Sequence, residues 1–121
     1  MTTNHTPGTW RAGKTGESVV SDQPLPGYGA NGGHDHVEYY GGYLIAESIW
    51  RAEDRALIAA APELLEALEK RAQVDAAYAR LAMSEVEHDD HERLLQQIEQ
   101  AEDAAKAAGR AAIAKAQGET Q

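Results

Sequence analysis

The chain of 121 residues contains no cysteine and no phenylalanine. Without cysteine it can form neither disulfides nor thiolate ligands, a composition that fits a reducing compartment such as the cytoplasm. Without phenylalanine, the core must be built from leucine, isoleucine, alanine, tyrosine and tryptophan. An alanine side chain is one methyl group, so burial worth about 25 cal/mol per Å² yields only a thin core. We therefore expect a homo-oligomer, in which association buries further apolar surface.

Basic residues are also scarce, with 11 lysines and arginines against 20 aspartates and glutamates and a formal net charge of −9. This charge disfavours nonspecific binding to nucleic acid or to an anionic membrane, because both ligands attract a basic face. It is compatible with a basic protein partner. No apolar run is long enough to span a bilayer, and the first residues lack the pattern of a signal peptide. We expect a cytoplasmic protein with no direct contact to nucleic acid or membrane.

Residues 1–50 are rich in glycine, tyrosine and turn-forming residues, which is typical of short strands. We predict two β-hairpins, one around the turn Gly13–Gly16 and one around Gly41-Gly42, because glycine tolerates the positive φ of a primed turn. A long loop over 22–37, dense in proline, glycine, asparagine and aspartate, separates the two hairpins. The predicted strands are residues 9–12, 18–20, 37–40 and 43–48.

The rest of the chain, residues 51–117, is helical in its apolar spacing. Pro62 cannot donate a helix hydrogen bond and favours the first turn, so it should begin a new helix. Five carboxylates between Glu85 and Glu92 repel one another and predict the corner of an antiparallel helical hairpin. One continuous helix from Pro62 to about Gln117 is the alternative. The predicted helices are residues 51–61, 62–83 and 91–117. The fold class is therefore α+β in one domain overall, with a small antiparallel sheet before a short helix and a long alanine-rich hairpin.

Two apolar stripes follow the predicted long helices at steps of three and four residues. The first consists of Leu65, Leu68, Ala72, Ala76, Ala79 and Met83, and the second of Leu94, Ile98, Ala101, Ala105, Ala108 and Ala112. Alanine allows two helices to approach closely, so such stripes are typical of helix-on-helix contact. We expect the second stripe to hold the homo-oligomer together.

One motif resembles the phosphate-binding loop of nucleotide hydrolases. Residues Gly8–Thr15 fit the pattern G-x-x-x-x-G-K-[ST]. That loop requires a buried strand before it and a helix after it, so that backbone amides meet the phosphates. Here no strand precedes Gly8, and the motif is followed by the strand predicted over residues 18–20 instead of a helix. The motif is better interpreted as a β-turn, and Lys14 is not expected to be catalytic.

Histidines occur in two clusters, His34-Asp35-His36 and His88-Asp89-Asp90-His91. Each cluster could offer two imidazoles on one side, which is half of the ligand set that zinc requires. We interpret both as solvated and predict no metal site.

Aromatic and arginine side chains gather around the predicted sheet. The candidate ligand-binding residues are Trp10, Tyr39, Tyr40, Tyr43, Arg51 and Arg55. Aromatic rings can stack on bases and paired guanidinium groups can hold phosphates, so this set predicts a nucleotide pocket. The alternative is that the aromatics form the core and the arginines pair with nearby carboxylates.

Three segments carry a resemblance to a family of small bacteriophage and prophage proteins. They are the start His5-Thr6-Pro7-Gly8-x-Trp10, the central run Ala56–Leu68 and the ending Arg110–Ala116. Many relatives have Asn-Ala-Arg before the Leu-Ile-Ala, where this chain has Asp54-Arg55-Ala56. The layout is also similar to phage anti-defence proteins that sequester cyclic nucleotide signals. The resemblance implies a protein that acts in the cytoplasm of a bacterial host.

No catalytic set of residues stands out, so we predict neither an enzyme nor a bound cofactor. Three hypotheses remain. The first is an anti-defence protein that sequesters a small cyclic nucleotide. The second is an acidic inhibitor that covers a basic surface of a host defence complex. The third is an accessory phage protein whose helices drive assembly.

Overall fold

The computed structural model describes residues 4–27 and 37–118. The predicted loop over 22–37 and the cluster His34-Asp35-His36 fall largely or wholly outside these residues. The chain divides into two compact units, one made of residues 1–62 with 113–121 and the other of residues 63–112. We call them the sheet unit and the hairpin unit.

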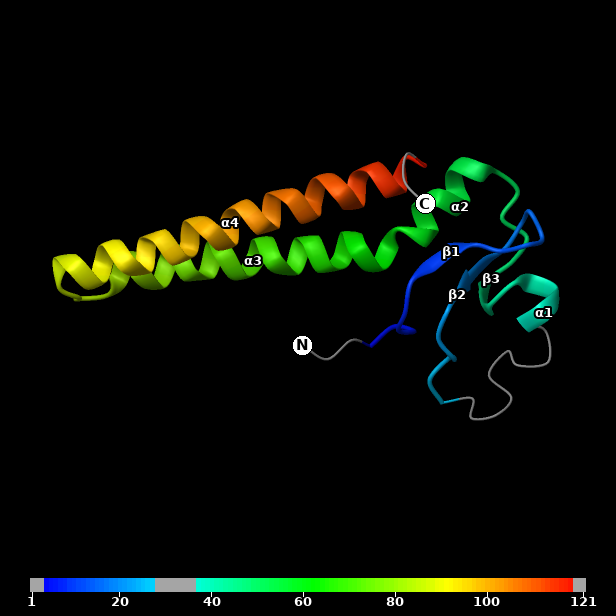
Figure 1. Ribbon diagram of the computed structural model, residues 1–121, viewed down its shortest axis with the longest axis horizontal. Coiled ribbons are helices and arrows are strands. Elements are labelled where there is room, and N and C mark those ends of the chain that lie inside the picture. Colours follow the sequence, from blue (N-terminus) through cyan, green and yellow to red (C-terminus); the bar gives the residue numbers. More distant parts are fainter. Residues whose placement is uncertain (1–3, 28–36, 119–121) are drawn as a thin grey trace. The chain divides into compact units, whose positions relative to one another are not determined.

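The sheet unit contains a three-stranded antiparallel sheet in the order β1-β2-β3 (Figure 1). The strands are β1 (Trp10–Ala12), β2 (Val19–Ser21) and β3 (Tyr43–Ala46). Val20 pairs with Arg11 on one side and Leu44 on the other, with an irregularity in register beside Val19. Val19 and Val20 are fully buried, as β-branched residues in a central strand should be.

The flanking serines of β2 are buried and satisfied. Ser21 Oγ donates to the carbonyl of Pro7 at 2.6 Å, and Ser18 Oγ donates to the carbonyl of Thr15 at 2.9 Å. Buried hydroxyls need such partners because an unpaired one costs free energy. The small core of this unit is therefore built around β2.

The predicted strand over 37–40 is wrong, because Val37–Tyr40 forms a helical turn, α1. The carbonyl of Val37 accepts hydrogen bonds from Gly41 N at 2.7 Å and Gly42 N at 3.0 Å. Gly41 has a φ of 83°, so it ends the turn in the left-handed region as glycine does after a helix. The two glycines thus close a helical turn rather than a hairpin. The α+β class is confirmed, with β3 pairing to β2.

After β3 the chain leaves the sheet and enters α2 (Ala52–Ala59). Ser48 has a φ of 64°, a left-handed conformation that ends the extended segment. Arg51 lies at the N-cap of α2 in extended conformation. Contacts join α2 to β1 and β2.

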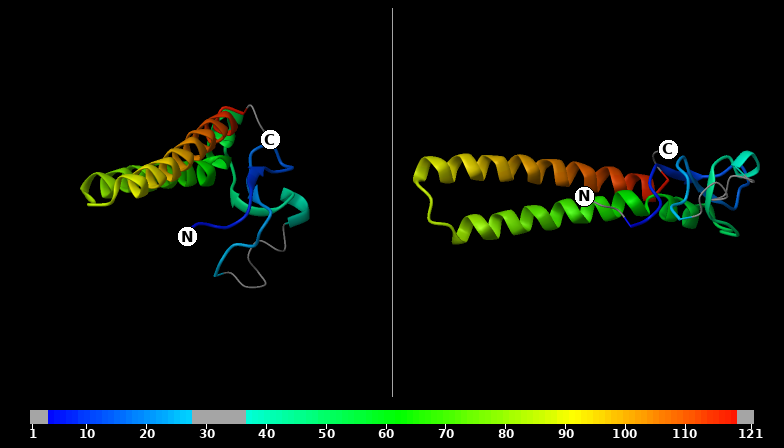
Figure 2. Two further views of the ribbon diagram at one scale, coloured as in Figure 1. Left: turned by 60° about the vertical axis from the view of Figure 1, so that its left-hand side comes forward. Right: turned by 90° about the horizontal axis from the view of Figure 1, so that it is seen from below.

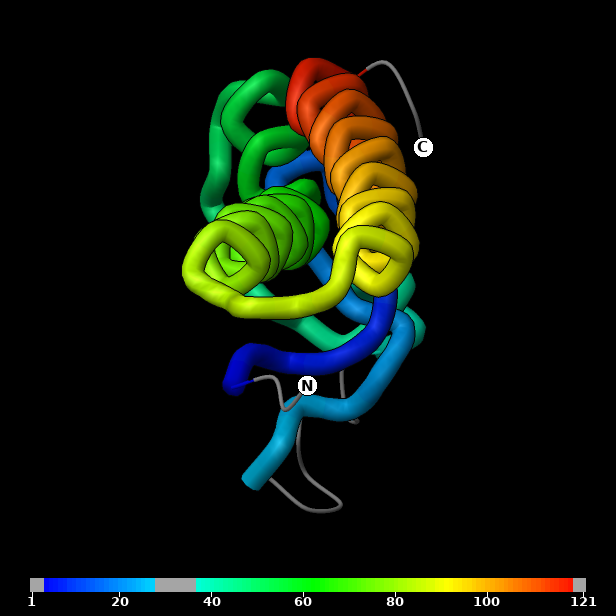
Figure 3. The backbone as a smooth tube through the Cα atoms, turned by 90° about the vertical axis from the view of Figure 1, so that its left-hand side faces the viewer, coloured from blue at the N-terminus to red at the C-terminus, as the bar shows by residue number. Residues whose placement is uncertain are grey.

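The hairpin unit contains most of α3 (Ala61–Met83) and most of α4 (His88–Ala116). The two helices run antiparallel and side by side, as two views show (Figures 2 and 3). Four residues between them lie outside the helices, so the alternative of one continuous helix is wrong. Ser84 Oγ donates to the carbonyl of Leu81 at 2.9 Å, which satisfies one of the free carbonyls at the end of α3.

The seam between the helices repeats every seven residues. Ala67, Val74 and Leu81 are buried on α3, and Ala105 and Ala112 are buried on α4. This spacing is typical of an antiparallel coiled coil. Ala105 and Ala112 of the stripe predicted on α4 are therefore buried inside the chain, whereas Ala101 of the same stripe is exposed.

The stripe predicted on α3 does not form this seam. Leu65, Leu68, Ala72, Ala76, Ala79 and Met83 are all exposed. The predicted stripe steps by three and four residues, whereas the buried residues Ala67, Val74 and Leu81 are spaced seven apart on another face of the helix. Periodicity predicts that a helix has an apolar face and does not decide between two such faces.

Candidate functional site

A cavity of about 320 Å³ lies within the sheet unit. Its described walls come from β1, α2 and the end of α4. The lining residues are Thr9, Trp10, Arg11, Ala12, Ala52, Arg55, Ala56, Ala59, Lys115 and Gly118. The alanines of α2 leave this space because their side chains are short. Its volume is near the lower end of the range of about 300–1,000 Å³ that ligand pockets occupy.

The cavity concentrates positive charge. Arg11, Arg55 and Lys115 line it, and none of its described lining residues is a carboxylate. The sheet unit contains only five lysines and arginines and has eight aspartates and glutamates. Three of the five basic residues therefore meet at one cavity, in a chain of net charge −9. Such a local potential attracts anions that the rest of the protein repels.

Trp10 supplies the aromatic surface of the cavity. Its indole Nε1 donates to the carbonyl of Thr6 at 3.0 Å, and the ring of His5 meets it edge-on with centroids 5.8 Å apart. These two contacts hold the indole in one orientation. A fixed indole beside cationic groups can stack on a planar base.

Arg55 connects the cavity to the segment that enters α2. Its Nη1 donates to the carbonyls of Ile49 at 2.7 Å and Trp50 at 3.2 Å. Among the described residues these are its hydrogen bonds, so the Nη2 and Nε donors are left for an anion. Arg55 can therefore hold the segment before α2 in place and bind a ligand at the same time.

Two cavity residues, Arg11 and Lys115, were not among the sequence candidates. Arg11 Nη2 donates to the carbonyl of Gly41 at 2.6 Å. Lys115 lies in the last turn of α4, far along the chain from β1. Adjacency of Arg11 to Trp10 was a usable signal for the first, whereas no local pattern places Lys115 beside a strand.

The structure brings Trp10 and Arg55 together at the cavity and leaves four predicted residues outside its lining. Arg51 is exposed and forms an ion pair with Glu53 at 3.8 Å. The rings of Tyr39 and Tyr40 meet edge to face, with centroids 4.9 Å apart.

Tyr40 and Tyr43 lie beside the sheet, at the end of α1 and the start of β3. Tyr40 donates to Glu47 Oε2 at 2.7 Å, and this hydrogen bond, with desolvation and nearby charge, raises the pKa of Tyr40. Tyr43 is half-buried at the start of β3. Neither lines the cavity.

The Gly8–Thr15 motif contains β1 and the start of the turn that leads to β2. Ser18 N donates to the carbonyl of Thr15 at 3.2 Å, and Gly13 N donates to the carbonyl of Ser18 at 3.0 Å. Lys14 Nζ donates to the carbonyl of Glu38 at 3.2 Å. Strand β2 follows, so the helix N-terminus that a phosphate loop requires is not at this position, and the β-turn interpretation is confirmed.

The histidines of the second cluster lie at the start of α4. His88 Nε2 is 3.3 Å from Glu92 Oε1. Within residues 4–27 and 37–118, no group of three or more histidine, aspartate or glutamate side chains is arranged to hold a metal ion.

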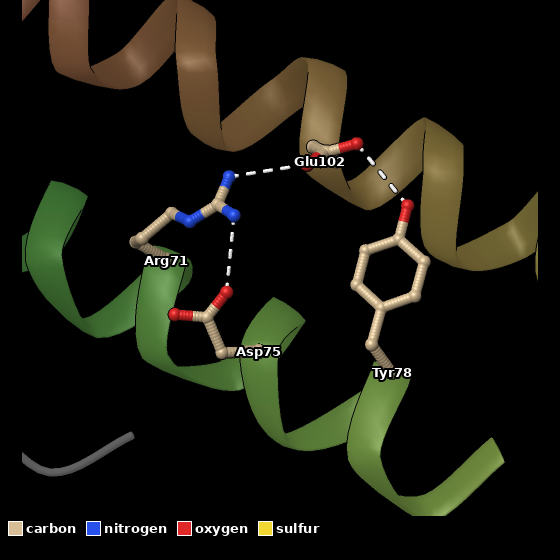
Figure 4. Close-up of polar contacts among 4 residues, drawn as sticks. All are labelled: Arg71, Asp75, Tyr78 and Glu102. Carbon is tan, nitrogen blue, oxygen red and sulfur yellow. Dashed lines mark hydrogen bonds and ion pairs between the residues drawn. The ribbon is translucent and has the colours of Figure 1, made fainter. Parts of the chain in front are cut away.

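A separate polar cluster joins the two helices of the hairpin unit (Figure 4). Glu102 on α4 accepts a hydrogen bond from Tyr78 at 3.1 Å and one from Arg71 at 3.2 Å. Arg71 also pairs with Asp75 at 3.0 Å. The bonds from Tyr78 and then Arg71 lower the pKa of Glu102. Because its members pair with one another, this cluster fastens α3 to α4.

None of the described helices has both the length and the apolar character needed to cross a membrane. No curated protein and no solved structure matches the chain. Residues 1–120 match the family described as Salmonella phage P22 protein Y8K6, which confirms the resemblance to small phage proteins. The chain therefore belongs to the Salmonella phage P22 protein Y8K6 family.

Proposed function

We propose that this phage protein binds a small nucleotide-class anion in the cavity of the sheet unit and thereby withdraws a host immune signal. The observation that carries the proposal is the meeting of Arg11, Arg55 and Lys115 beside the indole of Trp10. Guanidinium and ammonium groups bind phosphate, and an aromatic face binds a base. A nucleotide presents both features at once.

The size of the cavity narrows the ligand class. A volume of about 320 Å³ is small among ligand pockets, which favours a mononucleotide or a cyclic mononucleotide over a cyclic dinucleotide. Membership of a phage family supports a role inside an infected bacterium. A site that holds its ligand tightly withdraws it from solution, which is how sequestration works.

An acidic inhibitor of a basic host surface is the second candidate. One observation favours it: all five carboxylates at the corner of the hairpin unit are exposed. Two of the five are engaged within the unit, because Asp90 pairs with Arg93 at 3.1 Å and Glu92 with His88. The cavity offers a shaped site, whereas the corner offers only charge, so we favour nucleotide binding.

Calorimetry against a panel of nucleoside monophosphates, cyclic mononucleotides, cyclic dinucleotides and cyclic ADP-ribose isomers tests the proposal. We expect Arg55→Ala to weaken binding of the best ligand at least tenfold, since a hydrogen bond to a charged group contributes about 1.5–3 kcal/mol. Arg51→Ala is the matched control, because it removes the same charge from an exposed side chain outside the cavity. It should change the affinity less than about twofold.

Because Arg55 also braces Ile49 and Trp50, Lys115→Ala provides a second variant in the cavity without that role. Its loss of affinity should also exceed that of Arg51→Ala. Absence of heat with every member of the panel would reject the proposal, as would equal losses in Arg51→Ala and Lys115→Ala. Tight binding to a basic host protein would then favour the second candidate.

A further inference from the structure

Helix α3 has an apolar face that the hairpin unit leaves open. We call it the outer face of α3 and define it by six residues: Leu65, Leu68, Ala72, Ala76, Ala79 and Met83. Leu65 is 46% exposed, Leu68 68% and Met83 87%, and the three alanines are exposed as well. Large apolar side chains aligned along one helix face mark a contact surface when they are exposed together.

The outer face is distinct from the seam that α4 covers. At 3.6 residues per turn, the six residues fall along one side of the helix, well away from Ala67, Val74 and Leu81. Those three are buried against α4. Helix α3 thus has two apolar faces, and the described part of the chain covers only one.

The order of residue sizes along the outer face is self-complementary. Large residues stand at both ends and alanines occupy the middle. In an antiparallel pair, Leu65 of one copy lies opposite Met83 of the other, Leu68 opposite Ala79, and Ala72 opposite Ala76. The alanines allow close approach at the centre while the large residues fill the two ends. One surface patch that matches itself is what a twofold dimer requires.

Charges beside the outer face fit the same arrangement. Glu69 and Arg80 border one edge of the face, and the antiparallel register places Glu69 of each copy opposite Arg80 of the other. Among the described residues neither side chain forms an ion pair within the chain, whereas the neighbouring charges do. Lys70 pairs with Glu66 at 3.4 Å, and Arg71 with Asp75 at 3.0 Å.

We propose that a second copy of this chain docks on the outer face of α3 in antiparallel orientation, with Ala72 and Ala76 at the centre. The two α3 helices then pack against each other between the two α4 helices, so that each α3 buries both of its apolar faces. This surface is independent of the cavity. It differs from the stripe on α4, of which Ala105 and Ala112 are already buried within the chain.

Light scattering and sedimentation of the full chain test the dimer. We expect a mass of twice 13.1 kDa for the unmodified protein. Ala76→Glu should raise the dimer dissociation constant at least tenfold, because it sets two carboxylates at the apolar centre. Ala107→Glu is the matched control, since it makes the same change at an exposed position of α4. It should leave the mass unchanged.

A charge-exchange series keeps the proposal testable if Ala76→Glu fails to fold. Glu69→Arg and Arg80→Glu should each weaken the dimer about tenfold by placing like charges opposite each other twice. The double variant should restore the affinity to within about threefold. A monomeric unmodified protein would overturn the proposal, even if another protein covered the face. So would a double variant no tighter than its parents.

Discussion

The sheet unit and the hairpin unit reach their stability by opposite routes. In the sheet unit a few buried residues, led by Val19 and Val20, depend on glycines that let backbone segments approach closely. In the hairpin unit a seam of alanine, valine and leucine side chains repeats every seven positions. The packing of the sheet unit tolerates few substitutions, because each close approach depends on one particular residue. The packing of the hairpin unit consists of many similar contacts.

The same contrast holds for charge. Three of the five basic residues of the sheet unit line one cavity, whereas the charges of the hairpin unit pair along its helices or face solvent. Long-range contacts can bring distant side chains into one concave site, and a regular hairpin cannot easily do so. Ligand chemistry is therefore expected in the sheet unit and association in the hairpin unit.

The largest loss of stability is expected when the seam between α3 and α4 is interrupted. Ala105→Glu places a carboxylate in the buried contact with α3, which should cost several kcal/mol. We expect the hairpin unit to lose helical ellipticity and the melting temperature to fall by more than about 10 °C. Ala107→Glu, which is exposed, is the control. A variant that melts like the parent but no longer self-associates would show that this stripe joins separate chains.

Replacing the tightly packed Gly42 should destabilise the sheet unit. A Cβ at Gly42 would meet Val20 Cγ2 at 2.8 Å and the carbonyl of Ser21 at 2.9 Å, so backbone must shift. We expect Gly42→Ala to lower the free energy of unfolding by about 1–3 kcal/mol. Chemical denaturation monitored by tryptophan fluorescence measures this. Gly16→Ala is the control, because its Cβ would meet nothing within 4 Å. Similar stabilities for the two variants would refute the close-packing account.

The same substitution should have the opposite sign in the hairpin unit. Gly109 lies within α4, and an added Cβ would meet nothing within 4 Å. Alanine at a helix interior is favoured over glycine by about 0.5–1 kcal/mol, so Gly109→Ala should raise the melting temperature by a few degrees. Calorimetric melting of the two proteins checks the sign. A lower melting temperature would mean that a neighbour occupies this space.

The smallest expected effect concerns acid. Glu102 has a lowered pKa in the folded chain, so its bonds to Tyr78 and Arg71 stabilise the hairpin above its unfolded value of about 4.3 and weaken as pH falls through the folded value. The parent should lose more stability between pH 7 and pH 3 than Glu102→Gln does. Thermal melts at both pH values measure this, with Glu99→Gln as the exposed control. Equal acid sensitivity in Glu102→Gln and the parent would remove the role of this carboxylate.

Much of the fold could be predicted from the sequence, because the signals for its helices and turns are local. Pro62 marked the break between two helices, and the acidic run near Glu87 marked the corner between α3 and α4. The strand expected over 37–40 became a helical turn because Gly41-Gly42 suits a helix end as well as a hairpin. In a hairpin turn and at a helix end, the two glycines differ only in which carbonyl group accepts the hydrogen bonds from their amides.

The site was harder to predict because its residues are distant in sequence. Trp10 and Arg55 were recognisable by residue type, and the structure places both at one cavity. Lys115 joins them through the return of α4 to the sheet unit, which no periodicity encodes. Arg51 shares a helix turn with Arg55 but lies outside the cavity lining, since one residue caps α2 and the other faces inward.

Native mass spectrometry of the protein purified from bacteria with active nucleotide signalling tests nucleotide capture most directly. The account predicts one retained nucleotide-class anion per chain, kept by Arg51→Ala and reduced at least tenfold in the double variant Arg55→Ala with Lys115→Ala. A parent protein that emerges without any retained small molecule, or a double variant that retains as much as the parent, would contradict it.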